Sequence, residues 1–398
     1  MAAGARATTG SLALLFGALL LSSRPSRGAP TAAAGATSAK STTSATTSAT
    51  GTASAASSTT SVDASTGAPL SAQAQQAVDA ADASLDAGDF TKAEAQFVKA
   101  EPLAPKSALP LVGHARAILA GLGVPFDLNA ALGDPAREKR VTEARKLLAS
   151  AQKLAPTYAP AFIEAGRAAL MVGDQSSALT ALDRAVTLAP DDPEAVSTRG
   201  IAKLALGKGD DAIKDLKRAV ELEPTSAPRR RNYGTALLLQ GRAADAVKSY
   251  DEALKLDPTS AGARNDLGAA LLETGDVARA IKELELAVKG APSEPVYRVV
   301  LGFAYQTAKR WADAEASYKE AIKLDDKRVA AWVDLGSCYL QEGKKEDARA
   351  ALKKALVLDP KEQRAQMMLD DLDAPPPAAK SSGSSSSSSS SKPPPKKP

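Results

Sequence analysis

Residues 159–192 read APAFIEAGRAALMVGDQSSALTALDRAVTLAPDD, which is the pattern of two short amphipathic helices joined by a tight turn. The first predicted helix is Pro160–Val172, because proline is tolerated in an opening turn. Gly173 then reverses the chain, since glycine adopts the positive φ that ends many helices. The second predicted helix, Gln175–Leu188, ends before Pro190, which cannot continue a helix. One hairpin of this size cannot bury its own apolar face, so it needs neighbours of the same kind.

The same spacing recurs every 34 residues on both sides of this stretch. With Ala159 as position 1, the glycines at position 8 are Gly166, Gly200, Gly234, Gly268, Gly302 and Gly336. The alanines at position 20 are Ala178, Ala212, Ala246, Ala280, Ala314 and Ala348. The closing prolines are Pro190, Pro224, Pro258, Pro292 and Pro360. Small residues at positions 8 and 20 indicate a close crossing of the two helices. Ala246, at position 20, is therefore predicted to be buried in the crossing, and Ala243 is predicted to be exposed. A fixed period of this length predicts stacked helical hairpins.

The repeat resembles the tetratricopeptide repeat, whose pattern has Trp near position 4, Leu-Gly at 7 and 8, Tyr at 11, Ala at 20 and 27, and Pro at 32. The best single match is residues 329–362, which carry Trp332, Leu335, Gly336, Tyr339, Ala348, Ala355 and Pro360. The resemblance implies an all-α fold, an α-solenoid of about eight helix-turn-helix repeats that forms a right-handed superhelix.

The predicted repeat units together cover residues 74–362. Their boundaries are 74–107, 108–158, 159–192, 193–226, 227–260, 261–294, 295–328 and 329–362. The second unit has an insertion near 121–139, which either folds over a groove or lengthens the second helix. Asp134 and Pro135 form a helix-start signal that favours a longer helix. Residues 363–373 are predicted to form a helix that caps the last apolar face.

The two ends of the chain differ from the repeats in composition. Residues 1–28 have the pattern of a signal peptide, with Arg6 before a short apolar run at residues 12–21. Export to the periplasm or the cell exterior is therefore expected. The alternative is an uncleaved inner-membrane anchor through residues 12–21, although that run is short for a membrane span. Residues 29–73, rich in Ser, Thr and Ala, and residues 374–398, rich in Ser, Pro and Lys, are predicted to be disordered.

The net charge of +4 comes from outside the repeats. Residues 74–362 hold 41 of the 50 Lys and Arg residues and 42 of the 46 Asp and Glu residues. A nearly neutral array of this kind argues against nucleic acid as a partner. A membrane contact is expected only if the N-terminal signal stays uncleaved, and the oligomeric state does not follow from the sequence.

Residues suited to catalysis or metal binding are scarce in this sequence. The one histidine, His114, lies in a first helix at position 7 and is predicted to be a buried structural residue. The one cysteine, Cys338, excludes an internal disulfide and is predicted to be a small core residue, with a reactive or pairing thiol as the alternative. No nucleophile and base pair or ligand set can be assembled from these residues. We therefore expect no enzymatic activity, no cofactor and no metal.

The resemblance implies that first-helix positions 2, 5, 9, 12 and 13 line a concave groove that holds a segment of a protein partner. The residues predicted at the groove are Val112, Arg116, Ile163, Arg167, Arg231, Thr235, Asn265, Val299 and Phe303. Phe303 is the preferred anchor site, because large aromatic side chains supply much of the binding energy at interfaces. Apolar residues with scattered arginines predict a partner segment that has hydrophobic anchors and some acidic residues.

Three arginines occupy position 4 in successive units, namely Arg230, Arg264 and Arg298. One interpretation is a ladder of guanidinium groups that binds carboxylates or phosphates of a partner. The other is that each arginine pairs with an acidic residue of its own or the preceding unit, while its stem covers apolar surface.

Taken together, the repeats and the signal-peptide pattern predict an exported protein-binding scaffold in cell-envelope assembly. The alternatives are a non-catalytic adaptor or regulator of an envelope enzyme, and a glycan-associated structural protein.

Overall fold

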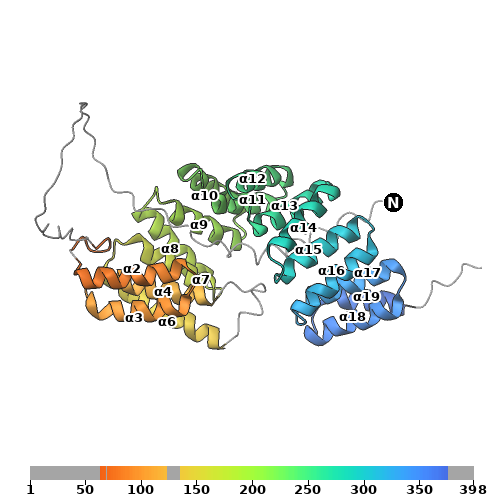
Figure 1. Ribbon diagram of the computed structural model, residues 1–398, viewed down its shortest axis with the longest axis horizontal. Coiled ribbons are helices and arrows are strands. Elements are labelled where there is room, and N and C mark those ends of the chain that lie inside the picture. Colours follow the sequence, from red (N-terminus) through yellow and green to blue (C-terminus); the bar gives the residue numbers. More distant parts are fainter. Residues whose placement is uncertain (1–62, 69, 123–134, 375–398) are drawn as a thin grey trace, which may run out of the picture. The chain divides into compact units, whose positions relative to one another are not determined.

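The computed structural model describes residues 63–68, 70–122 and 135–374 (Figure 1). These residues form 17 α-helices, one short 3-10 helix and no strand, which confirms the predicted all-α fold. The chain divides into two compact units, residues 1–293 and 294–398. The predicted signal peptide and nearly all of the predicted C-terminal tail lie outside the described residues. None of the helices in the described ranges is both long and apolar enough to span a membrane.

Both units are built from helical hairpins. The helices of the first unit are α2 (Ala72–Asp86), α3 (Phe90–Ala100), the 3-10 helix η2 (Glu101–Leu103), α4 (Leu109–Gly121), α6 (Pro135–Leu154), α7 (Ala159–Leu170), α8 (Gln175–Leu188), α9 (Pro193–Ala205), α10 (Gly209–Leu222), α11 (Ala227–Leu239), α12 (Ala243–Leu256), α13 (Ala261–Thr274) and α14 (Val277–Gly290). Those of the second are α15 (Pro295–Thr307), α16 (Trp311–Leu324), α17 (Val329–Glu342), α18 (Lys345–Leu358) and α19 (Gln363–Asp373). In each repeat the first helix packs against the second, and α19 packs against α18.

The hairpin α7–α8 shows how the sequence sets these boundaries. Helix α8 is Gln175–Leu188, as predicted, and its N-cap Asp174 accepts a hydrogen bond from the Ser177 amide at 3.1 Å. Helix α7 ends at Leu170, two residues before the predicted end. The reason is the turn at Gly173, whose φ of +69° brings its amide to the Leu170 carbonyl at 3.1 Å.

The position-8 glycines lie where the two helices of a hairpin cross, as predicted. A Cβ added to Gly166 would lie 2.5 Å from Cγ of Leu182, and one added to Gly302 would lie 2.7 Å from Cε1 of Tyr318. Both neighbours occupy position 24 of the same repeat and are fully buried. Glycine is therefore required because a large side chain of the second helix fills the space that a Cβ would need.

Overpacking at position 20 is expected to be costly. Ala246→Leu should lower the free energy of unfolding by about 1–3 kcal/mol, because Ala246 is fully buried where α12 packs against α11. Ala243, predicted to be exposed, is instead half-buried, whereas Ala244 is exposed. Ala244→Leu is therefore the control and should leave stability nearly unchanged. Urea denaturation followed by circular dichroism measures both variants, and equal losses would contradict this packing.

First helices of the first unit lie against one another in sequence: α2 with α4, α4 with α7, α7 with α9, α9 with α11, and α11 with α13. The second helices do not pack on one another to this extent. First helices that lie closer together than second helices form the inner side of a curved stack. In the second unit α15 contacts α17, and α17 contacts α19. The predicted right-handed course stays a prediction.

The sequence makes a prediction for the segments before and after α4, and the structure contradicts the first and agrees with the second. Asp63–Ala68, predicted to belong to a disordered linker, forms a turn in which the buried Asp63 carboxylate accepts a hydrogen bond from Ser65 Oγ at 2.6 Å. Ser65 Oγ accepts one from the Ala108 amide at 3.1 Å, which fixes the turn to the start of α4. At the other end, α6 begins at Pro135, as the helix-start signal predicts. Residues 123–134 lie outside the described residues.

Candidate functional site

The first-helix face of the first unit is the surface formed by α4, α7, α9, α11 and α13. It is the inner side of the stack and the place where the sequence predicts a partner. The structure brings the predicted residues of this unit onto successive helices: Val112 and Arg116 on α4, Ile163 and Arg167 on α7, Arg231 and Thr235 on α11, and Asn265 on α13. Val299 and Phe303 lie on α15 in the second unit.

Five of the nine predicted groove residues are buried: Val112, Ile163, Thr235, Asn265 and Val299. Their side chains are covered because successive first helices pack closely, as when Ile163 packs with Ala195 of the next first helix. The accessible part of the predicted lining consists of Arg116, Arg167, Arg231 and Phe303, which are each partly exposed. Of the predicted lining, the three arginines and the phenylalanine are therefore the residues that a partner can reach. Their contact with a partner stays a prediction.

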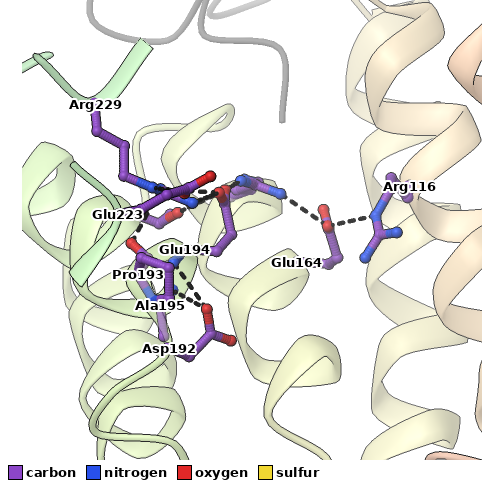
Figure 2. A network of polar contacts seen from close by, with 10 residues as sticks. Arg116, Glu164, Asp192, Pro193, Glu194, Ala195, Glu223 and Arg229 are labelled. Carbon is purple, nitrogen blue, oxygen red and sulfur yellow. Dashed lines mark hydrogen bonds and ion pairs between the residues drawn. The ribbon is translucent and has the colours of Figure 1, made fainter. Parts of the chain in front are cut away.

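A row of ion pairs connects the first helices, and Glu164 is its buried centre (Figure 2). Glu164 is 1 % exposed and accepts hydrogen bonds from Arg116 Nε and Arg167 Nη1, both at 2.8 Å. Burial alone raises the pKa of Glu164, but the positive charges of Arg167 and Arg116 outweigh it and hold that pKa below its ordinary value. Arg116 comes from the preceding repeat, so this carboxylate joins α4 to α7.

The row continues from α7 to α11. Arg167 pairs with Glu194 at the start of α9, and Glu194 also accepts hydrogen bonds from both terminal nitrogens of Arg229 at 3.2 Å. Arg229 donates further to Glu223 Oε2 at 2.5 Å and to the Pro193 carbonyl at 3.0 Å. Each cation has a carboxylate partner, so the face is close to neutral and is held in place by forked hydrogen bonds.

A second buried acid lies at the same repeat position further along. Asp266 on α13 is 0 % exposed and accepts a hydrogen bond from Arg231 Nε of the preceding repeat at 2.6 Å. Burial raises the pKa of Asp266, and the Arg231 ion pair offsets only part of that rise. In the second unit, Asp334 of α17 has the same position and pairs with Arg364 of α19 at 2.8 Å.

Sequence reasoning missed these position-6 acids, although a signal was present. Glu164, Asp266 and Asp334 recur at one repeat position on first helices whose neighbouring positions are mostly apolar. Charged residues in such a place are rarely buried unless they are paired. Their recurrence could have indicated inter-repeat ion pairs, but not which arginine supplies each partner.

Two of the three arginines at position 4, Arg230 and Arg264, pair with an acidic residue as the second interpretation predicts. Arg230 donates to the Pro224 carbonyl at 3.1 Å and pairs with Glu252 of its own repeat. Arg264 donates in the same way to the Pro258 carbonyl at 2.9 Å and pairs with Glu283 at 2.6 Å. Arg298 belongs to the second unit. Partner binding through Arg230, Arg264 and Arg298 stays a prediction.

Comparisons with known proteins now identify the family. Models of the tetratricopeptide repeat match residues 197–261, 237–300 and 300–362. Residues 197–362 belong to the tetratricopeptide repeat family. The hairpins from α2 to α8 precede these matches and extend the tetratricopeptide array toward the N-terminus. Members of the family bind peptide or protein partners. No curated protein matches the chain.

Solved structures show the same fold at low sequence identity. One chain of the APC/C hetero-tetramer Cut9–Hcn1 is 16 % identical to this chain, with a TM-score of 0.57 over 72 % of this chain and 53 % of that one. The chain thus spans about half the length of that relative. PilW, a type IV pilus biogenesis factor, is 19 % identical, with a TM-score of 0.50 over 53 % of this chain and 98 % of that one. A tetratricopeptide repeat protein of Parabacteroides merdae is 16 % identical, with a TM-score of 0.50 over 62 % and 97 %.

His114 has a structural place in the tetratricopeptide array. It is 7 % exposed on α4, and its Nδ1 lies 2.7 Å from Glu101 Oε1 of the 3-10 helix that precedes α4. The contact ties the end of the first repeat to the second. The predicted buried structural histidine is therefore confirmed.

Cys338 is fully buried on α17, which agrees with the predicted core residue. Burial and the nearby carboxylates of Glu342 and Glu315 raise the pKa of Cys338 to about 11. At about pH 8 the thiolate fraction should therefore be near 0.001, and iodoacetamide should alkylate the native protein about a hundredfold more slowly than the urea-unfolded chain. Mass spectrometry of timed samples measures both rates. Equally fast alkylation would show that the thiol is accessible and reactive.

Proposed function

We propose that this protein is an exported scaffold that holds a segment of a protein partner on the first-helix faces of its tetratricopeptide array and acts in cell-envelope assembly. The observation that carries the binding proposal is the unbroken succession of first helices in contact, from α2 to α13 in the first unit. Such a succession offers one continuous inner surface for an elongated segment. The signal-peptide pattern at residues 1–28 supports the proposed export and, with it, the proposed envelope role.

The accessible residues on these faces indicate the chemistry of the partner segment. Arg116, Arg167 and Arg231 keep 33 %, 23 % and 16 % of their side chains exposed while their carboxylate partners hold them in fixed positions. Fixed guanidinium groups recognise carboxylates with little loss of side-chain entropy. Phe303 supplies a partly exposed aromatic surface in the second unit. An acidic segment with hydrophobic anchors matches both features.

Site-specific photocrosslinking tests the binding proposal. p-Benzoylphenylalanine replaces Phe303 in the full chain produced in its native host, and the same residue at Lys217 of α10 serves as the control, because 63 % of the Lys217 side chain is exposed on a second helix. We expect the probe at position 303 to crosslink one or a few proteins, and the probe at position 217 to crosslink none of these proteins. The same adducts at both positions, or none at Phe303, would contradict partner binding on the first helix α15 of the second unit.

Export is tested separately by cell fractionation. The full chain should appear outside the cytoplasm in a form shortened at its N-terminus, and a variant without residues 1–28 should stay in the cytoplasm. A full-length product in the membrane fraction would favour the uncleaved anchor. Equal distribution of both forms would remove the export proposal without affecting the crosslinking result.

A further inference from the structure

A groove lies on the other side of the first unit, away from the first-helix face. Its walls are the second helices α6 and α8, and its floor is the first helix α7 between them. We call it the α6–α8 groove, with Arg145 and Gln152 on one wall, Phe162 and Ala165 on the floor, and Thr180 and Arg184 on the other wall. Its volume is about 580 Å³, within the range of roughly 300–1,000 Å³ that binding pockets occupy.

The groove exists because α7 carries small residues where later repeats carry large ones. Ala165 and Ala169 occupy positions 7 and 11 of their repeat and line the floor. The residues at position 7 of the following repeats are Arg199, Tyr233, Leu267, Leu301 and Leu335, and those at position 11 are Lys203, Leu237, Leu271, Tyr305 and Tyr339. A methyl group in place of a longer side chain leaves the space between the two second helices unfilled.

The charged side chains that line the groove are all positive. Its lining residues include Arg145 and Arg184 and no Asp or Glu. Arg145 pairs with Asp174 at 3.0 Å. Arg184 is exposed, and within the described part of the chain no ion pair or hydrogen bond engages its guanidinium group. Of the hydroxyl groups along the α8 wall, that of Thr180 donates to the Ser176 carbonyl at 2.9 Å and that of Ser177 is hydrogen-bonded to Asp174, so Ser176 supplies the donor for a bound segment.

The dimensions favour a short extended segment. Arg145 and Gln152 are two turns apart on α6, a distance of about 10 Å at 1.5 Å per residue. This length takes about three residues of extended chain. The apolar floor, with Phe162 and the alanines, accommodates one hydrophobic side chain between the cationic ends.

The terminal segments of this chain do not complement the groove. Residues 1–62 and 375–398 contain Lys and Arg but no Asp or Glu. Like charges would therefore oppose their approach to Arg145 and Arg184. The occupant that the charge and the apolar floor favour comes from another protein.

We propose that the α6–α8 groove binds a short extended segment of a partner protein that carries a hydrophobic side chain next to an acidic residue. Arg184 receives the carboxylate at one end of the groove, and the floor around Ala165 receives the hydrophobic side chain. The site is separate from the first-helix face and does not depend on it. It would give the array a second attachment point, on its outer side.

The test uses random dodecapeptides displayed on phage, selected against the full chain and counter-selected against Ala165→Leu. Leucine is native at this position in three later repeats, so this variant should fold, which thermal unfolding verifies. Enriched peptides are then synthesised with a fluorescent label and titrated by anisotropy. We expect them to combine Asp or Glu with a large apolar residue. Their Kd should rise about tenfold or more for Arg184→Glu and for Ala165→Leu.

Two matched variants make the result specific. Arg218 has the same repeat position on α10 as Arg184 has on α8, but Arg199 and Lys203 stand at positions 7 and 11 there, so Arg218→Glu should leave the Kd within about twofold. Phe303→Ala should also leave it unchanged, because Phe303 belongs to the other compact unit.

The proposal is overturned by any of four results. The first is that no peptide is enriched, and the second is that the enriched peptides lack acidic residues. The third is that the Kd of the peptides changes with Phe303→Ala but not with Ala165→Leu. The fourth is that the protein self-associates in sedimentation equilibrium and Arg184→Glu abolishes this association. The last result would assign the groove to a second copy of the chain. Binding of decanoate without any peptide enrichment would assign it to a small anionic amphiphile and equally overturn the proposal.

Discussion

Glu164→Ala is expected to lower the free energy of unfolding by about 3 kcal/mol. The lower end of the range for breaking a buried ion pair, about 3–5 kcal/mol, applies because Arg116 and Arg167 keep some contact with water. Glu164 itself is nearly inaccessible and its carboxylate joins α4 to α7. Its loss removes the carboxylate that Arg116 and Arg167 share, and Arg167 then keeps only its pair with Glu194. Urea denaturation followed by circular dichroism, with hydrogen exchange in α4 and α7, measures the effect.

An exposed ion pair supplies the control. Glu143 of α6 pairs with Arg140 one turn away, and 47 % of its side chain is exposed. Glu143→Ala should therefore cost less than about 1 kcal/mol. A loss at Glu164 no larger than at Glu143 would show that the row of ion pairs does not stabilise the stacking of first helices.

The two buried acids should also respond to pH with opposite signs. The pKa of Glu164 is lowered in the folded protein, so its contribution to stability is present above its unfolded pKa and is lost as the pH falls through its folded pKa. The pKa of Asp266 is raised, so its contribution is present below its unfolded pKa and is lost as the pH rises through its folded pKa. Unfolding free energies of Glu164→Gln and Asp266→Asn, compared with the unmodified protein from about pH 3 to 7, measure both slopes. Slopes of the same sign would contradict these assignments.

Tyr250→Ala is expected to lower the free energy of unfolding by about 3–5 kcal/mol, the usual range for removing a buried aromatic side chain. Tyr250 is 0 % exposed at position 24 of its repeat, and its ring covers Gly234 of the facing helix. Its hydroxyl also makes a buried hydrogen bond with Thr235 Oγ1 at 3.0 Å. Tyr250→Phe keeps the ring and should cost about 1 kcal/mol. Urea denaturation of both variants separates the cavity from the hydrogen bond.

A double-mutant cycle tests the link between Tyr250 and Gly234. A Cβ at Gly234 would lie 2.8 Å from Cε1 of Tyr250, so Gly234→Ala alone should cost about 1–3 kcal/mol through overpacking. In the Tyr250→Ala background the same substitution should cost much less, because the ring that it would meet is gone. Additive losses would show that the ring does not set the need for glycine at position 8.

The repeating pattern alone was enough to predict the hairpins, because the signals that set them are local. Helix α8 follows from Asp174 as cap and Pro190 as terminator, and the glycines at position 8 follow from the close crossing inside one repeat. A period of 34 residues fixes which residues face each other within a hairpin, whatever the rest of the chain does.

Pairing between repeats could not be predicted in this way. The contact of Arg116 with Glu164 joins residues 48 positions apart, and the burial of Ile163 and Asn265 depends on how closely successive first helices approach. The open floor at Ala165 likewise becomes a groove only because α6 and α8 stand apart above α7. Sequence therefore determined the unit that is repeated, through local caps, turns and small residues. Tertiary stacking decided which charges pair, which side chains are covered and where a hollow remains, because these depend on distances between helices that no single repeat contains.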